Sequence, residues 1–306
     1  MIAVQQQSRV LRPDHLPDLA GILGPLVHGR DPSWARPATG VFIKASRTPE
    51  GPGVEVITVD PAAGSVHHRA YGVGAPWLAE RIEDLLGLHD DDSGFEPPPQ
   101  LRTIWRRHRG WRVPKTSLVV ETLVPIVLGQ KVTGVEAYAS YRRLVLAHGE
   151  PVGFGPLPEL RLPPEAATWR SIPSWEWHRA GVGPERSRTV VAAMGRADAL
   201  ERLVRRPSGE AQLAMRALPG IGEWTAAEVA QRVFGDADAI SVGDFHVAKS
   251  VVHTLTGRRN GTDADMLELV EPFRPHRFRV QRLVELGRLG QPRRGPRYAG
   301  LDMRGI

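Results

Sequence analysis

The segment at residues 218–222, LPGIG, has the composition of a turn that binds an anion. Helical patterns precede and follow it, whereas Pro219 and the glycines at positions 220 and 222 interrupt them. A glycine leaves its backbone amide uncovered, and uncovered amides at the start of a helix form a site for phosphate oxygens. We therefore expect phosphate contacts from this turn, which comprises Leu218, Pro219, Gly220, Ile221 and Gly222. A plain turn between two helices would show the same pattern.

The second chemical candidate is a carboxylate, Asp244, at the end of the segment GDADAISVGD at residues 235–244. A helical pattern, FHVAKSVVHTL, follows directly, so we expect Asp244 to cap the start of that helix. Capping alone would explain an aspartate at this position. A carboxylate held there can also stabilise a developing positive charge or deprotonate a water molecule, and the two roles are compatible.

Composition limits the chemistry that the rest of the chain can supply. The 306 residues are 41% hydrophobic and 24% charged, which is ordinary for a globular protein of two or three domains. Cysteine is absent, which excludes disulfides, a thiol nucleophile and cysteine-ligated zinc or iron–sulfur sites, and we expect no cofactor of these kinds. No run approaches the roughly 18 apolar residues of a membrane span, and the N-terminal residues lack the pattern of a signal peptide. We expect a cytoplasmic, nucleoid-associated protein without a membrane partner.

The basic residues are unevenly distributed and favour a nucleic-acid partner. The formal net charge is +6, and residues 271–306 alone hold nine arginines against three acidic residues. Residues 101–115, LRTIWRRHRGWRVPK, combine six basic residues with two tryptophans and no acid. Such segments suit nucleic acid, although an arginine-rich solvated surface would look the same. In the tail we expect Arg293 and Arg294 to contact DNA.

The hydrophobic patterns divide the chain into an α/β part and a helical part. Residues 41–46 and 54–60 alternate as strands around a turn, and residues 76–88 have an amphipathic helical pattern. From about residue 115 the signal is helical, and a buried helix at 117–130 is expected to kink or stop near Pro125. Further helices are expected at residues 135–149, 185–195, 196–206, 208–217, 224–234, 263–273 and 277–287, with a proline-rich loop at 151–165.

The expected fold class is therefore α+β. A small N-terminal α/β domain, with an antiparallel sheet and helices, precedes a mostly α-helical domain. The acidic, proline-rich residues 90–99 are the best candidate for a linker. We place the N-terminal domain at residues 1–112, the helical domain at 113–290 and a basic C-terminal tail at 291–306.

Four segments together resemble the helix-hairpin-helix DNA glycosylases with a Gly/Pro-rich loop and a catalytic aspartate, the HhH-GPD superfamily. They are GQKVT at 129–133, LPGIGEWTA at 218–226, GDADAISVGD at 235–244 and EPFRPHRFRV at 271–280. The similarity covers residues 121–287 and is closest to the 3-methyladenine DNA glycosylase II type, whose N-terminal α/β domain is matched more weakly by residues 1–100. This resemblance implies a monomeric DNA-repair enzyme. It would flip a damaged, alkylated purine base out of duplex DNA and hydrolyse its N-glycosidic bond.

The resemblance also assigns roles to the chemical candidates. Asp244 becomes the catalytic carboxylate, which stabilises the oxocarbenium-like sugar as the base leaves. In similar glycosylases that also nick the strand, a lysine stands two places after the last hairpin glycine; Trp224 occupies that place here, which implies hydrolysis by water. Lys249 is another amine, but we expect it to meet phosphate or solvent. The backbone carbonyls of Leu218 and Ile221 would hold a monovalent cation.

The base pocket of this family is usually walled by aromatic residues, because cationic alkylated bases stack on electron-rich rings. Trp224 and Phe245 fit that role. Glu228 stands where the family often has an aromatic residue. It either contacts the base, by reading a base edge or attracting a cationic purine, or lies on a solvated helix face. The segment WEWHRAG at residues 175–181 either reaches the pocket or forms a loop packed by two buried tryptophans. Its candidates for the pocket are Trp175, Trp177 and His178.

The GQKVT segment is expected to contact DNA through Gln130, Lys131 and Thr133. Lys131 stands where relatives often carry a bulky residue that fills the gap left by the flipped base, which leaves the identity of this wedge residue open. Three alternatives remain: a non-catalytic helix-hairpin-helix DNA-binding protein, a glycosylase for bulky or deaminated bases, and a lyase-active glycosylase. Asp244 argues against the first, because a carboxylate beside DNA lowers affinity, and Trp224 argues against the last.

Overall fold

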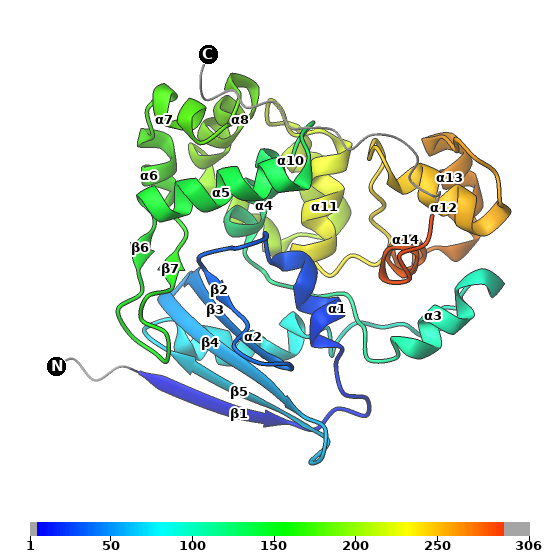
Figure 1. Ribbon diagram of the computed structural model, residues 1–306, viewed down its shortest axis with the longest axis horizontal. Coiled ribbons are helices and arrows are strands. Elements are labelled where there is room, and N and C mark those ends of the chain that lie inside the picture. The colour runs from blue at the N-terminus through cyan, green and yellow to red at the C-terminus, as the bar shows by residue number, and fades with distance from the viewer. Residues whose placement is uncertain (1–4, 291–306) are drawn as a thin grey trace.

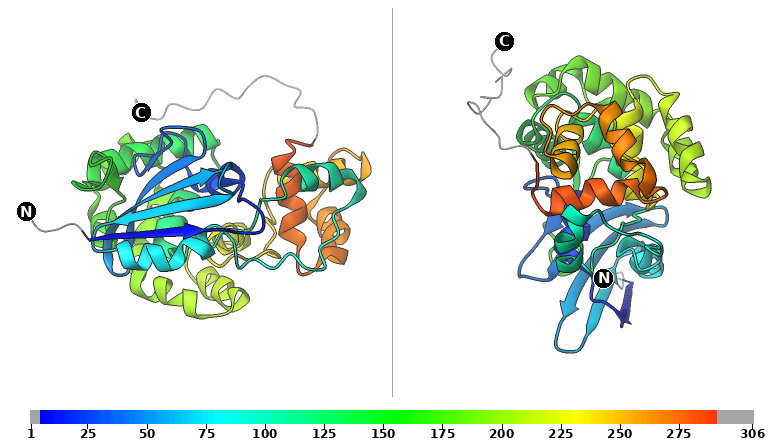
Figure 2. Two further views of the ribbon diagram at one scale, coloured as in Figure 1. Left: turned by 90° about the horizontal axis from the view of Figure 1, so that it is seen from below. Right: turned by 90° about the vertical axis from the view of Figure 1, so that its right-hand side faces the viewer.

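The computed structural model of the chain describes residues 5–290 (Figure 1). An antiparallel sheet forms one part of the molecule, and helices gather beside it in a larger second part. Two further views show the same arrangement, with the last helices of the chain gathered at one end (Figure 2). The expected α+β fold class is confirmed.

The sheet has five strands in the order β1-β5-β4-β3-β2, and each neighbouring pair is antiparallel. The strands predicted at 41–46 and 54–60 form its centre, and the turn between them closes at the pair Thr48 and Gly51. The helix predicted at 76–88 packs against this sheet as α2. The elements are β1 (Gln6–Leu11), β2 (Trp34–Ala35), β3 (Val41–Thr48), β4 (Gly51–Asp60), β5 (Ser65–Tyr71) and α2 (Ala75–Leu85).

Both faces of the central strands are covered, because successive side chains of a strand point to opposite sides. Phe42 and Ile57 face one way and pack with the short helix α1 (Leu19–Leu23) and with α2. Ile43 and Val54 face the other way and pack with Leu160 of the predicted proline-rich loop. That loop contributes only two-residue strands, β6 (Glu150–Pro151) and β7 (Arg161–Leu162), yet it seals the outer face of the sheet.

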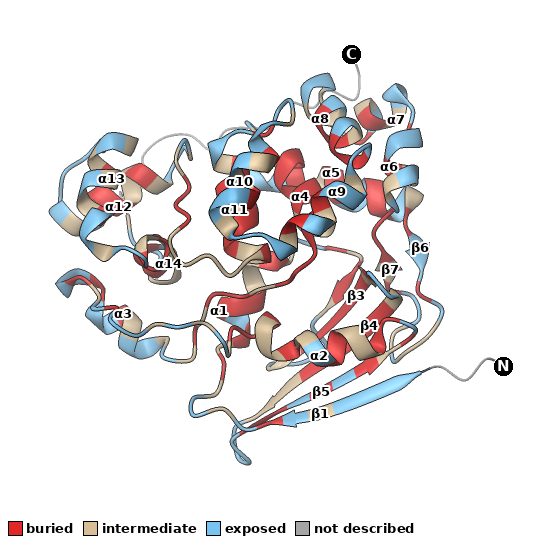
Figure 3. Cartoon of the chain, turned by 180° about the vertical axis from the view of Figure 1, so that it is seen from behind, coloured by how far each residue is buried: buried red, intermediate tan, exposed pale blue. Residues whose placement is uncertain are grey.

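The helical part is built around α4 (Val119–Leu128), which is buried along most of its length (Figure 3). The carboxylate of Glu201 accepts hydrogen bonds from the amides of Val119 and Val120 at 2.9 and 2.8 Å, which satisfies the start of this helix. Helices packed on α4 include α5 (Gly134–His148), α8 (Pro184–Met194) and α11 (Glu223–Val233).

Of the two outcomes expected at Pro125, a kink or a stop, the stop is wrong. The helix continues through Pro125 to Leu128. Proline removes one intrahelical hydrogen bond, but every residue from Leu123 to Leu128 is apolar and buried, so packing maintains the helix past that position.

The remaining predicted helices are present, but two of them end in 3₁₀ turns: the helix predicted at 196–206 continues as Arg202–Arg205, and the helix predicted at 263–273 continues as Glu271–Phe273. Within residues 5–290 no helix is long and apolar enough to cross a membrane. The other α-helices are α3 (Arg102–Arg107), α6 (Ala166–Ser171), α7 (Ser174–Arg179), α9 (Ala197–Glu201), α10 (Ser208–Arg216), α12 (Val247–Thr256), α13 (Asp263–Val270) and α14 (Arg277–Leu286). The short helices α1, α3, α6 and α7 were not predicted.

A separate apolar cluster joins the last three helices to residues 95–104. Phe95, Leu101 and Ile104 are buried together with residues of α12, α13 and α14, and α3 lies beside this group (Figure 1). The segment predicted as a linker therefore leads the chain from the sheet to the C-terminal helices and back to α4. The division at residue 112 remains a prediction.

Candidate active site and DNA-binding hairpin

The predicted hairpin is formed by α10, the turn at residues 218–222 and α11. Gly220 has a φ of +84°, and a methyl group there would lie 2.0 Å from the Thr189 hydroxyl oxygen. Gly222 caps α11 with a φ of −92°, and a methyl group there would meet nothing within 4 Å. The positive φ in this turn thus belongs to Gly220 and not to Gly222. Gly220 is required by the fold, whereas the open space at Gly222 leaves its amide accessible.

The GQKVT segment lies against this turn. Gln130 donates its amide to the Gly220 carbonyl at 2.9 Å and to the Thr225 hydroxyl at 2.8 Å, so its side chain braces the hairpin. Thr133 forms a capping box with Glu136, so its hydroxyl accepts a hydrogen bond from the Glu136 amide at the start of α5. Lys131 has a φ of +55°, which is uncommon for a lysine, and its side chain is 88% exposed. Of these residues Lys131 is the one directed into solvent beside the turn.

Asp244 lies just before α12, and both of its oxygens are engaged. Oδ1 accepts from the amides of His246 and Val247 at 2.7 and 3.0 Å, so the expected contact with amides at the helix start is present. The helix itself begins later than expected, at Val247, and its N-cap residue is His246. Oδ2 accepts from the indole nitrogen of Trp224 on α11 at 3.2 Å. The carboxylate is thereby fixed between the two helices, one of which begins at the glycine turn.

Two further predicted residues join Asp244. The Trp224 ring is half-buried against the helical core, and its N–H faces the carboxylate. Phe245 is 74% exposed, and the Lys249 ammonium lies 4.1 Å from its ring centre. A carboxylate, two aromatic rings and one cation therefore gather where α11 and α12 begin. An exposed ring and a fixed anion can receive a flat, cationic group.

Comparisons with known proteins agree with this geometry. The 3-methyladenine DNA glycosylase of Archaeoglobus fulgidus superposes with a TM-score of 0.75 at 18% identity, over 92% of this chain and 98% of that one. The 8-oxoguanine glycosylase/lyase of Clostridium acetobutylicum superposes with a TM-score of 0.70 at 13% identity, over the same shares of both chains. The chain has the fold of the helix-hairpin-helix DNA glycosylases.

Sequence similarity to curated proteins is more distant. The "Probable bifunctional transcriptional activator/DNA repair enzyme AlkA" of Mycobacterium tuberculosis is 29% identical over 245 residues, which cover 74% of this chain. The same residues cover 46% of that protein, so the chain spans about half the length of the curated relatives it matches. No protein-family model matches the chain.

The segment at residues 175–181 does not join the site of this glycosylase fold. It forms α7, which lies at the far side of the helical part from α12 (Figures 1 and 3). Trp177 is buried, stacks on Trp169 and donates its N–H to the Ile172 carbonyl. Trp175 is exposed beside Arg179. Placing Trp175, Trp177 and His178 in the base pocket is therefore wrong, and the packing interpretation holds for Trp177 alone.

Glu228 is neither solvated nor free to read a base. Its Oε1 accepts from the Ser241 hydroxyl at 2.5 Å, and its Oε2 lies 2.9 Å from the Arg232 guanidinium. The side chain is only 14% exposed. Both alternatives drawn from the sequence are thus replaced by a structural contact. Ser241 was not a candidate, and a serine inside the apolar run AISV is the one signal that could have found it.

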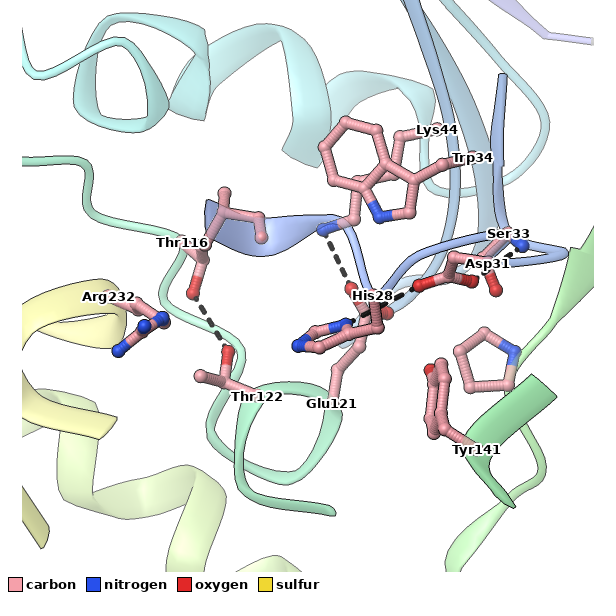
Figure 4. A pocket seen from close by; sticks show the side chains of 12 residues that line it. His28, Asp31, Ser33, Trp34, Lys44, Thr116, Glu121, Thr122, Tyr141 and Arg232 are labelled. Atoms are coloured by element: carbon pink, nitrogen blue, oxygen red, sulfur yellow. Dashed lines mark hydrogen bonds and ion pairs between the residues drawn. The ribbon is translucent and has the colours of Figure 1, made fainter. Parts of the chain in front are cut away.

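A small cavity lies between the sheet and the helical part (Figure 4). Its polar walls include Asp31, Lys44, Glu121, Tyr141 and Arg232, and its volume is about 30 Å³. That space suits an ordered water molecule and is far too small for a nucleobase. Asp244 is not among its lining residues, so this cavity is not the base site.

The predicted contacts of the C-terminal tail, Arg293 and Arg294, lie outside the described residues. Their role as DNA contacts remains a prediction.

Proposed function

We propose that this chain is a monofunctional DNA glycosylase that flips an alkylated purine out of duplex DNA and hydrolyses its N-glycosidic bond. The observation that carries the proposal is the fixed carboxylate of Asp244, held between the Trp224 indole and the first amides of α12. This carboxylate stands next to a hairpin with an uncovered amide at Gly222. The phosphate-binding turn and the catalytic carboxylate would thus be joined by one helix, α11, which follows Gly222 and whose Trp224 bonds Asp244.

Each residue contributes one step. The turn at residues 218–222 grips a backbone phosphate through its amides, and Lys131 and Lys249 supply positive charge toward DNA. The flipped base stacks on Trp224 and Phe245, which favours a purine made cationic by alkylation. As the bond between the sugar and the base breaks, its electron pair leaves with the base, which departs neutral. Asp244 stabilises the cationic sugar, water adds to it, and the proton released goes to Asp244 or to solvent.

The hydrolytic assignment rests on Trp224. A lyase needs an amine nucleophile at the sugar, and this place after the hairpin holds an indole whose N–H is bonded to Asp244. Lys249 is the nearby amine, and its ammonium lies over the Phe245 ring. We therefore expect intact abasic strands as product and no covalent adduct on borohydride treatment. A borohydride-trapped adduct that disappears in Lys249→Ala would establish lyase chemistry instead.

The proposal includes a monovalent cation at the hairpin carbonyls of Leu218 and Ile221. The Leu218 carbonyl accepts a hydrogen bond from the Ile221 amide at 3.1 Å, which leaves it a second lone pair for a cation. Carbonyl oxygens are suitable hard ligands. A cation there would add positive charge beside the phosphate. We further propose that the chain acts as a monomer.

The test is base release from duplexes that contain 3-methyladenine, 7-methylguanine, 1,N6-ethenoadenine, hypoxanthine, uracil or 8-oxoguanine. We expect release of alkylated purines, and a fall of about 100-fold or more in Asp244→Asn, because one preorganised contact to a developing charge is worth roughly 3 kcal/mol. Asparagine keeps an oxygen for the α12 amides, so folding and DNA affinity should persist. DNA binding without release of any base by the wild type would favour a non-catalytic DNA-binding protein. Release by Asp244→Asn at the wild-type rate would remove Asp244 from the mechanism.

A further inference from the structure

Ser241 is fully buried three residues before Asp244, and its hydroxyl is the centre of a polar network. The hydroxyl oxygen accepts hydrogen bonds from the side-chain amides of Gln231 on α11 and Gln281 on α14, each at 2.9 Å. The hydroxyl proton is donated to Oε1 of Glu228 at 2.5 Å. The segment before Asp244 is thus held from two helices through one oxygen atom.

Backbone partners fix the direction of these hydrogen bonds. Oε1 of Gln281 accepts the Ser241 amide at 3.0 Å, so the other end of that side chain must be its NH₂ group. Gln231 donates to the Ala239 carbonyl at 2.9 Å, which likewise directs its NH₂ group toward Ser241. Both acceptor positions of the hydroxyl are therefore filled. The single proton of the hydroxyl needs an acceptor, and the carboxylate of Glu228 is that acceptor.

The same helix also contacts Asp244 directly. Trp224 and Glu228 lie one turn apart on α11 and therefore point to the same side. Trp224 bonds Oδ2 of Asp244, whereas Glu228 bonds Ser241, whose carbonyl accepts the Asp244 amide at 3.3 Å. Two side chains of α11 hold the two ends of the turn at residues 241–244.

We propose that Glu228 is a positioning residue, which holds the Asp244 turn against α11 through Ser241. The inference rests on the proposed catalytic role of Asp244. The second oxygen of Glu228 pairs with Arg232, so its charge is compensated locally. What the site requires from Glu228 is an acceptor oxygen, and the carboxylate takes no part in reading the base.

Four variants distinguish a role for the acceptor oxygen of Glu228 from a role for its negative charge. Glu228→Gln keeps an oxygen for Ser241 and removes the charge, whereas Glu228→Met removes both at similar length. Ser241→Ala breaks the same bond from the other side. Glu268→Gln, at an exposed position of α13, is the control for loss of one negative charge. Circular dichroism shows which variants fold.

The first measurement is the single-turnover rate of base release at saturating enzyme, beside the affinity for a duplex with an abasic site. We expect Glu228→Met and Ser241→Ala to slow release by about 10- to 100-fold for every lesion that the wild type accepts, because misplacing a catalytic group by about 1 Å has effects of this size. Abasic-site affinity should be unchanged. Glu228→Gln and Glu268→Gln should stay within about twofold of the wild type.

The second measurement is the indole N–H spectrum of the eight tryptophans by ¹⁵N–¹H NMR. The Trp224 signal, assigned by its loss in Trp224→Phe, reports the bond to Asp244. We expect it to shift in Glu228→Met and Ser241→Ala and to stay in place in Glu228→Gln, while the other indole signals are unmoved. A general loss of stability would not produce this selective shift.

Several outcomes would overturn the proposal. Equal slowing in Glu228→Gln and Glu228→Met would show that the charge acts directly, and slowing for one lesion alone would show that Glu228 reads the base. A folded Glu228→Met protein that releases base at the wild-type rate would show that Glu228 has no positioning role. If Glu228→Met does not fold, Ser241→Ala and Glu228→Gln decide by the same criteria. If the wild type releases no base at all, the proposed function fails, whereas the Trp224 signal still tests the positioning geometry.

Discussion

Trp224 would have two roles in the proposed reaction. Its ring offers an aromatic face beside the exposed Phe245, and its N–H orients the carboxylate of Asp244. A hydrogen bond to an ionised acceptor contributes about 1.5–3 kcal/mol, which is more than a neutral pair gives. In the proposed mechanism, the orientation of the carboxylate and the wall of the base pocket therefore depend on the same side chain.

Trp224→Phe separates the two contributions. The phenyl ring preserves the aromatic face but cannot donate to Asp244, so we expect base release to slow by about tenfold with little change in DNA affinity, corresponding to about 1.5 kcal/mol. Single-turnover base release and fluorescence anisotropy measure the two quantities. Trp77→Phe, on α2 beside Arg81, is the matched control and should release base at the wild-type rate. Equal rates in both variants would mean that the indole N–H has no part in catalysis.

At the residue scale, local features were predictable and partners distant in sequence were not. The contact of Asp244 with amides at the start of α12 follows from three adjacent residues and a helical pattern, and the structure shows it, although the helix begins at Val247 and not directly after Asp244. The pairing of Glu228 with Ser241 depends on how residues 235–244 return to α11, which no local pattern encodes. Trp175 and Trp177 are two positions apart in a helix, so they point to nearly opposite sides, and only one could be buried.

At the scale of elements, the two glycines of the hairpin differ. The fold requires Gly220, whereas Gly222 is available for the proposed phosphate contact. Gly220 adopts a positive φ against Thr189, and its carbonyl is held by Gln130. Gly222 has an ordinary φ and open space around it. The composition of LPGIG predicted a turn with uncovered amides, but it could not tell which glycine the fold needs, because that depends on the position of α8.

This division gives a paired prediction. Gly222→Ala should fold with wild-type stability, because its methyl group meets no atom within 4 Å. Its affinity for DNA should nevertheless fall, because the methyl group crowds an amide that contacts phosphate. The loss should be equal for lesion-containing and undamaged duplex, since phosphate carries no information about the lesion. Fluorescence anisotropy at several salt concentrations measures the affinity, and thermal denaturation measures the stability.

Gly220→Ala is the counterpart in the same turn. Its methyl group would lie 2.0 Å from the Thr189 hydroxyl oxygen at a φ of +84°, so we expect a loss of stability of more than about 1 kcal/mol. If a folded Gly222→Ala protein binds DNA as tightly as the wild type, the hairpin is only a structural turn and does not contact phosphate through Gly222.

The course of α4 illustrates the limit of sequence patterns for a whole element. Proline is a helix breaker in isolation, so a stop near Pro125 was the reasonable expectation. The helix lies at the centre of the helical part, where packing on α5, α8 and α11 outweighs the loss of one hydrogen bond. Its far end delivers Gln130 and Lys131 to the hairpin, so the continuation past Pro125 matters for the site.

At the scale of the whole molecule, a buried ion pair links the sheet to the helical part. Lys44 of β3 and Glu121 of α4 lie 2.7 Å apart at the wall of the small cavity (Figure 4). Asp31 also lines this cavity, and Glu55 lies opposite Lys44 on the neighbouring strand. The ammonium group of Lys44 thus interacts electrostatically with three carboxylates where the two parts of the chain meet.

These carboxylates decide the protonation state of Lys44. Burial by itself would lower the pKa of its ammonium, but Glu121, Glu55 and Asp31 outweigh burial, so the pKa lies above its ordinary value of 10.5. A raised pKa of a base means that the folded state binds the proton more tightly than the unfolded state. Its contribution to stability is therefore complete below about pH 10.5, the ordinary value. It is lost as the pH rises through the higher pKa of the folded state.

Lys44→Met tests this interface. Methionine fills a similar volume but leaves the buried carboxylate of Glu121 without its cation, so we expect the free energy of unfolding at pH 7 to fall by about 3–5 kcal/mol. Urea denaturation measures this free energy at pH 7 and in steps up to pH 11. The wild type should lose stability at the alkaline end, whereas the variant should lose less there, because it has already lost the ion pair.

A double variant, Lys44→Met with Glu121→Met, is the control for shape. Replacing both partners with apolar side chains removes the uncompensated charge of the closest carboxylate, so most of the lost stability should return. Base release by the double variant should match the wild type, because these residues lie at the cavity between the sheet and the helical part and not at Asp244. A single variant as stable as the wild type at pH 7 would show that the ammonium does not hold the two parts together.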